Sequence, residues 1–107
     1  MVFFTLTGKH FELTESIREY VNEKVGRLPR YYSSIQRLDV ILEGQKGADT
    51  KVKVEIIAKA KRRRIFVAKE TGVDVVGCLE SAVQKLEQRL RKIKTKERER
   101  KHTPKRS

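Results

Sequence analysis

The residues of this sequence that could do chemistry are mostly lysines and arginines, and they are concentrated at its C-terminal end. The segment 85–107 carries 11 Lys/Arg against 3 Glu, a net charge of +8, and the other 84 residues carry the remaining +4 of a total of +12. Such a concentration of cations attracts polyanions, because each phosphate that they neutralise releases condensed counterions. The charge distribution therefore predicts a nucleic acid as the partner. An acidic membrane surface or an acidic protein is the alternative.

Four of these cations recur at a spacing of 4-3-4, which at 3.6 residues per turn places them on one stripe of a helix. Between residues 85 and 96 this stripe contains no acidic residue, so its like charges repel one another unless a polyanion meets them. The alternative is a merely solvated helix face. We predict that this basic stripe binds RNA; its members are Lys85, Arg89, Lys92 and Lys96.

Further basic residues suggest additional RNA contacts. In the N-terminal third these are Lys24, Arg27 and Arg30, although Lys24 could instead cover the edge of the core with its aliphatic stem. The other flank of the last helix is basic too, but there Glu87 is spaced to pair with Arg91. A run of basic residues at a predicted hairpin could serve either for RNA contact or for solubility. The secondary candidates are Arg62, Arg63, Arg64, Arg91 and Lys94.

Other kinds of site find little support in the sequence. No Cys/His spacing is typical of zinc, and no glycine-rich phosphate loop or nucleophile motif is present. Cys78 lies within a predicted helix and is interpreted as a buried structural thiol. We therefore predict a protein that is not an enzyme and has no cofactor, metal or small-molecule substrate. A lone cysteine, with no membrane-span or signal-peptide pattern, predicts a cytoplasmic protein that does not contact the membrane.

Hydrophobic periodicity predicts the elements that position these cations. Alternation indicates strands over about 2–7, 35–43, 51–59 and 65–69, with Gly8 ending the first. A helix begins after Thr14 as its cap and ends near Pro29, and a second begins after Asp74. The apolar positions of this last helix are Val76, Leu79, Val83, Leu86, Leu90 and Ile93. The predicted fold class is α+β, a two-layer β-α-β-β-β-α sandwich with two helices on one face of a four-stranded mixed sheet.

The apolar stripe of the last helix ends at Ile93, and the residues that follow are too charged to pack into a core. We therefore predict one domain over residues 1–96 and a basic, flexible tail over residues 97–107.

Several segments resemble the ribosome hibernation promoting factors, a family that includes the ribosome-associated translation inhibitor and was once called sigma-54 modulation protein. The opening segments FTLTG (4–8), FELTESIREYV (11–21) and KVGRL (24–28) match the start of the family pattern, and KLEQRLRKIK (85–94) matches its end. Together they extend over about residues 4–96. Two departures are Val76, where the family has an aromatic residue, and the order Gln88-Arg89, which is inverted.

The resemblance implies the same β-α-β-β-β-α fold and a function on the ribosome. Members of the family bind the small ribosomal subunit, contact 16S rRNA through basic helices, cover the mRNA channel and the tRNA positions, and silence idle ribosomes. Because the chain ends at Ser107, it resembles the short class, which is expected to be monomeric away from the ribosome. Two alternatives remain: a general structured-RNA-binding module of the double-stranded-RNA-binding type, and a transcription-modulating interaction protein.

Overall fold

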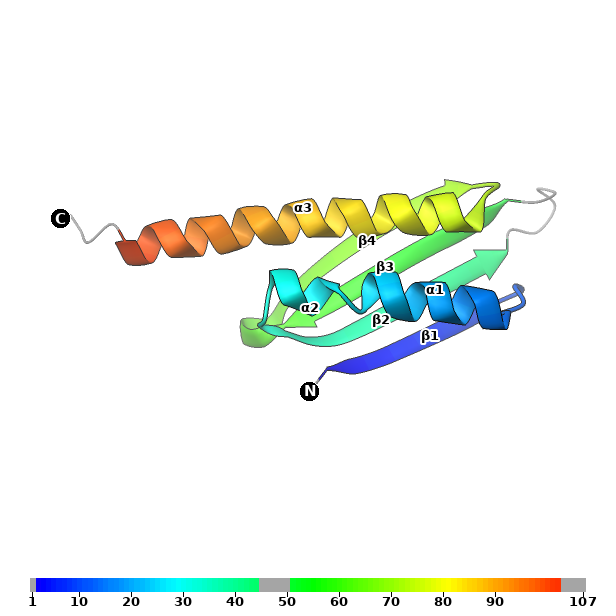
Figure 1. The fold of residues 1–107 in the computed structure, drawn as a ribbon, viewed down its shortest axis with the longest axis horizontal. Helices are drawn as coiled ribbons and strands as arrows, with labels where there is room; N and C mark the ends of the chain where they lie inside the picture. Colours follow the sequence, from blue (N-terminus) through cyan, green and yellow to red (C-terminus); the bar gives the residue numbers. More distant parts are fainter. Residues whose placement is uncertain (1, 45–50, 103–107) are drawn as a thin grey trace.

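The computed structural model describes residues 2–44 and 51–102, and from residue 94 onward it describes the backbone alone. Two long helices and a short one lie on a four-stranded sheet (Figure 1). The elements in chain order are β1 (Phe3–Lys9), α1 (Glu15–Val25), α2 (Leu28–Tyr31), β2 (Ile35–Gly44), β3 (Val52–Ala60), a 3₁₀ turn (Lys61–Arg63), β4 (Arg64–Gly72) and α3 (Val75–His102).

The strands lie in the order β1-β2-β3-β4. β1 and β2 run parallel, since the helical segment between them carries the chain back across the sheet, whereas the β2–β3 and β3–β4 pairs are antiparallel. α1 and α3 cover the same face of the sheet (Figure 1). The predicted fold class, a two-layer β-α-β-β-β-α sandwich with a mixed sheet, is therefore confirmed.

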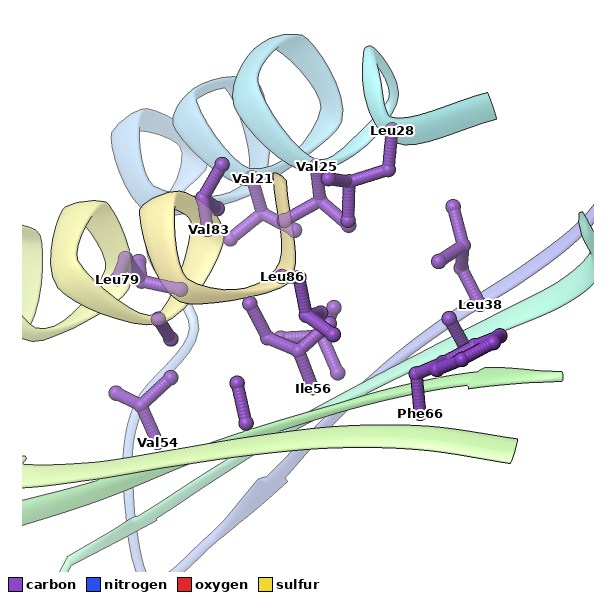
Figure 2. Packing of buried hydrophobic residues seen from close by; sticks show 14 of the residues in the cluster. Val21, Val25, Leu28, Leu38, Val54, Ile56, Phe66, Leu79, Val83 and Leu86 are labelled. Atoms are coloured by element: carbon purple, nitrogen blue, oxygen red, sulfur yellow. The ribbon is translucent and has the colours of Figure 1, made fainter. Parts of the chain in front are cut away.

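The core lies between the helices and the sheet, and alternation along the strands determines which side chains enter it. Leu38 of β2 and Val54 and Ile56 of β3 point from the sheet toward the helices (Figure 2). Val21 of α1 and Leu86 of α3 meet them and are fully buried. Each large apolar side chain buried in this way stabilises the fold by about 1.5–3 kcal/mol.

Local signals fix the ends of the helices. The side chain of Thr14 accepts a hydrogen bond from the amide of Ile17 at 3.3 Å, which confirms the predicted cap of α1. Asp74 accepts from the amide of Val76 at 3.2 Å and caps α3 in the same way. Pro29 lies in the first turn of α2, where its missing N–H costs little.

The prediction that Gly8 ends the first strand is wrong. β1 continues to Lys9, because Gly8 pairs with Leu42 in the parallel register. A Cβ at Gly8 would lie 2.6 Å from the carbonyl oxygen of Phe11, so the glycine allows the following turn to pack against the strand. The fourth strand is likewise longer than predicted and covers Arg64–Gly72.

The first turn of α3 also differs from the prediction. Val76 was expected in the core, but its side chain is 41% exposed. The buried stripe begins instead with Val75, which is partly buried and packs against the core, and continues through Cys78 and Leu79. Val75 is four residues before Leu79, so it lies above that residue on the same helix face, and Val76 lies about 100° away from it.

α3 continues as a helix to His102, past the predicted domain boundary at residue 96. The division into a domain and a flexible tail over residues 97–107 stays a prediction. None of the helices in the described part of the chain combines the length and apolar composition needed to cross a membrane.

Candidate nucleic-acid interface

The basic stripe borders a hollow between α3 and the edge strand β4. Leu79, Leu86 and Leu90 bury one face of α3 against the sheet, and the flank beside that face is turned toward β4. The hollow between helix and strand has a volume of about 340 Å³. We call it the β4–α3 groove; its lining residues are Val67, Ala68, Lys69, Lys85, Gln88, Arg89 and Lys92.

Arg89 is the cation of the groove whose position is best defined. Its guanidinium donates a hydrogen bond to the carbonyl oxygen of Val67 at 3.3 Å and lies 5.8 Å from the centre of the Phe66 ring. Within the described residues this is the one hydrogen bond that Arg89 donates, and its side chain is exposed. The rest of its five donors therefore remain available to phosphate oxygens.

Lys85 is not an unpaired charge, although the stripe itself contains no acidic residue between residues 85 and 96. Its ammonium forms an ion pair with Glu70 of β4. The acid comes from a different element, so inspection of the helix alone could not reveal it. Lys92 is exposed and forms no ion pair within the described residues. Lys96, the fourth member of the stripe, lies beyond the described side chains, as does Lys94.

On the opposite flank of α3, Arg91 does not pair with Glu87 as its spacing predicted. Its guanidinium lies 4.9 Å from the centre of the Tyr31 ring of α2. A cation over an aromatic face is attracted by the ring quadrupole, and the fold brings Tyr31 within reach. Arg91 therefore joins α2 to α3, which makes it a weaker candidate for RNA contact.

The candidates near α1 and α2 are only partly free. Lys24 is half-buried, and its ammonium lies 5.8 Å from the Tyr20 ring centre, close to its alternative role at the edge of the core. Arg27 forms an ion pair with Glu23 at 3.4 Å, and both side chains are well exposed, so the pair is weak. Arg30 is exposed in the last turn of α2.

The hairpin arginines divide into one that is held and two that are exposed. Arg64 donates to the hydroxyl of Tyr32 at 3.0 Å. The Tyr32 ring is buried and meets Phe66 edge to face, with 6.0 Å between ring centres. Arg62 and Arg63 are exposed at the tip. The hairpin lies at the same end of the sheet as α2 (Figure 1).

Two polar side chains of the groove, and its two apolar lining residues Val67 and Ala68, were absent from the predicted site. Lys69 ends the predicted fourth strand, and its charge was the available signal. Gln88 has no charge and follows Glu87 on the helix, so no pattern distinguished it. The structure brings Lys69, Lys85, Arg89 and Lys92 together around one hollow. That these residues bind RNA stays a prediction.

No part of the described chain offers a catalytic constellation. Cys78 is buried, as predicted, and burial together with the nearby charges of Glu70 and Asp74 raises the pKa of its thiol. A thiol of this kind is a poor nucleophile, because the reactive form is the thiolate. Among the described residues, no group of three His, Cys, Asp or Glu side chains could hold a metal ion.

Comparison with known proteins gives consistent results. The family model described as sigma 54 modulation protein / S30EA ribosomal protein matches residues 4–98. The ribosome hibernation promotion factor of Lactococcus lactis subsp. cremoris is 29% identical over 96 residues, and that of Deinococcus radiodurans is 33% identical over 98 residues. Each alignment covers 90% of this chain and 51% of the relative. The chain thus spans about half the length of these relatives.

Solved structures show the same fold. The N-terminal domain of Thermus thermophilus Protein Y superposes with a TM-score of 0.73 at 28% identity, covering 87% of this chain and 99% of that one. A ribosomal subunit interface protein from Coxiella burnetii gives a TM-score of 0.76 over 88% and 99% of the two chains; at 21% identity this likeness concerns the fold alone.

Proposed function

Because the chain belongs to the sigma 54 modulation protein / S30EA ribosomal protein family, we propose that it binds the small ribosomal subunit and silences idle ribosomes. It contacts 16S rRNA, occupies the mRNA and tRNA channel, and inhibits translation by steric occlusion. This role places it in the cytoplasm, as a monomer away from the ribosome. The relatives found by sequence are named as hibernation factors and not as enzymes, which agrees with the predicted lack of catalysis.

The observation that carries the proposal is the charge of the β4–α3 groove. Four cations surround it, and one acid, Glu70, neutralises part of that charge. Phosphate contacts from side chains in fixed positions determine how a protein sits on RNA. Arg89 meets this requirement, because strand β4 holds its guanidinium from below through Val67 and Phe66.

The proposal is tested by binding to purified small subunits at a series of salt concentrations, together with inhibition of cell-free translation. Affinity should fall steeply with salt, with log K against log[salt] sloping by about −0.7 to −0.9 for each phosphate neutralised. Inhibition should disappear over the same salt range and be relieved by added subunits. A flat salt response would remove RNA as the main partner. Equal affinity for an unrelated RNA duplex would instead indicate the general structured-RNA-binding module.

A further inference from the structure

The hairpin between β3 and β4 is built with unfavourable residues. Arg62 and Arg63 both have positive φ, 64° and 60° respectively. In this left-handed region the Cβ of an L-residue crowds the following carbonyl, which is why glycine and asparagine predominate in such turns. Two consecutive arginines there cost stability that Asn or Gly would not, and neither arginine has an ion pair within the described residues to offset it.

The surrounding structure holds the hairpin in this conformation. At its start, the amide of Lys61 donates to the carbonyl oxygen of Ser34 at 3.0 Å. At its end, Arg64 donates to the hydroxyl of buried Tyr32. With both ends fixed, the strained tip persists and its two arginines stay exposed. Strain retained at a surface site is a reason to look for a function there.

The same contacts connect the hairpin to the β4–α3 groove. Arg64 bonds Tyr32, the Tyr32 ring packs on Phe66, and the Phe66 ring lies beneath Arg89. The exposed tip and the groove therefore belong to one packed unit and keep a fixed separation. Two cationic points at a fixed separation suit a folded RNA, whose phosphates are also fixed in space.

We propose that Arg62 and Arg63 form a second phosphate-binding point that contacts the bound RNA separately from the β4–α3 groove. This inference rests on the proposed function, because it assigns the tip to the same partner. It also accounts for the presence of arginine at two positions where it destabilises the turn. The competing explanation is that the tip only adds charge for solubility.

The test uses two double variants with the same loss of charge. One carries Arg62→Asn and Arg63→Asn, and the other Arg62→Gln and Arg63→Gln. Asparagine tolerates the left-handed region and glutamine has no such preference. Both variants should bind small subunits several-fold more weakly, with a salt slope smaller in magnitude by about 1.4 to 1.8 for two lost contacts. The asparagine variant alone should also melt several degrees higher.

The control carries Lys9→Gln and Lys51→Gln, which remove the same charge at the opposite end of the sheet. Its affinity should stay close to that of the wild type, and an equal loss would reduce the effect to net charge and overturn the proposal. Hairpin variants that bind like the wild type would overturn this proposal as well. In that case, a loss of binding in a variant with Arg89→Gln and Lys92→Gln would show that the proposed function itself still holds. An asparagine variant that gains no thermal stability would show that the backbone at Arg62 and Arg63 is not strained. A wild-type protein that does not bind small subunits would overturn both proposals.

Discussion

Arg89 makes two contacts at once, and a lysine would reproduce their geometry less well. The guanidinium carbon lies 5.8 Å from the centre of the Phe66 ring, while one N–H group donates to the carbonyl oxygen of Val67. Lysine offers the same charge as a compact, strongly hydrated ammonium on a flexible stem. At this position we therefore expect geometry to contribute to the proposed binding in addition to charge.

We accordingly expect Arg89→Lys to weaken binding to small subunits several-fold, although the net charge is unchanged. Lys92→Arg is the matched control: Lys92 forms no ion pair within the described residues, so this exchange should have little effect. Titration of both variants against purified subunits at one salt concentration checks the prediction. Equal affinities for the two variants would show that Arg89 acts through its charge alone.

Asp39 shows how a single residue stabilises the sheet face that the helices leave uncovered. It accepts hydrogen bonds from the hydroxyl of Thr5 on β1 and from Nε of Arg37, which lies 3.0 Å from each of the two carboxylate oxygens. Burial of the carboxyl favours its neutral form, but these hydrogen bonds and the charges of Arg37 and Lys59 outweigh that effect and lower the pKa of Asp39 below 3.8. Ionised Asp39 thus ties β1 to β2.

A lowered carboxyl pKa contributes stability that is fully present above the unfolded-state pKa and is lost as the pH falls through the folded-state value. The melting temperature of the wild type should therefore exceed that of Asp39→Asn at pH 7. The difference should shrink once the pH falls below about 3.9. Thermal melts from pH 7 to pH 2 measure it, and a difference that stays constant with pH would contradict an ionic role.

At the level of elements, α3 packs mainly against β4, which is an edge strand of the sheet. The carbonyl oxygen of Val67 on this strand accepts a hydrogen bond from Arg89. Arg89 places a positive charge beside this edge strand, and the exposed Lys69 on the strand adds another. Charged side chains on an edge strand discourage pairing with a foreign strand, so the cations that we propose to bind RNA also protect this edge.

The pairing of Lys85 with Glu70 limits the charge that α3 can offer. Glu70→Gln removes this acid, and we expect it to raise the affinity for small subunits several-fold. The Lys85 side chain is well exposed but that of Glu70 is only 23% exposed, so loss of the pair should lower thermal stability modestly. Glu55→Gln, which makes the same charge change on the far face of the sheet, should leave affinity almost unchanged. Subunit binding and melting curves for both variants test this, and weaker binding by Glu70→Gln would show that the acid orients Lys85 productively.

The strands and α3 also show which features of the structure could be predicted from the sequence and which could not. Alternation in β2 and β3 and the 3.6-residue period of α3 depend on local spacing, so the fold followed from them. The Lys85–Glu70 ion pair and the Arg91–Tyr31 cation–π contact join residues far apart in the chain, so they depend on how the helices pack on the sheet. The left-handed tip at Arg62 has no glycine or asparagine to signal it. Lys85, Arg89 and Lys92 of the stripe line one groove, as their spacing on the helix suggested, but the contacts that these residues make were not predicted.

For the whole molecule, the placement of charge matters more than its total. The helix α3 continues beyond the sheet (Figure 1), so its cations fall into two groups. Those at Arg89 and Lys92 stand over the sheet beside β4, whereas those at Arg98 and Arg100 lie on the part of the helix past Ile93, where the apolar stripe has ended. At low salt, a long-range electrostatic attraction to RNA would depend equally on both groups. At physiological ionic strength, screening reduces interactions beyond about 8 Å.

A comparison of charge reversals in the two groups separates placement from total charge. One variant carries Arg89→Glu and Lys92→Glu, the other Arg98→Glu and Arg100→Glu, and both change the net charge by the same amount. We expect the first to abolish inhibition of cell-free translation while its melting temperature stays near that of the wild type, because it reverses charge where the sheet positions phosphate contacts. The second should retain most of the inhibition, because that part of the helix extends past the strands of the described chain (Figure 1). Equal losses at physiological salt would mean that the protein binds RNA only as a basic polymer does, and that the β4–α3 groove has no special role.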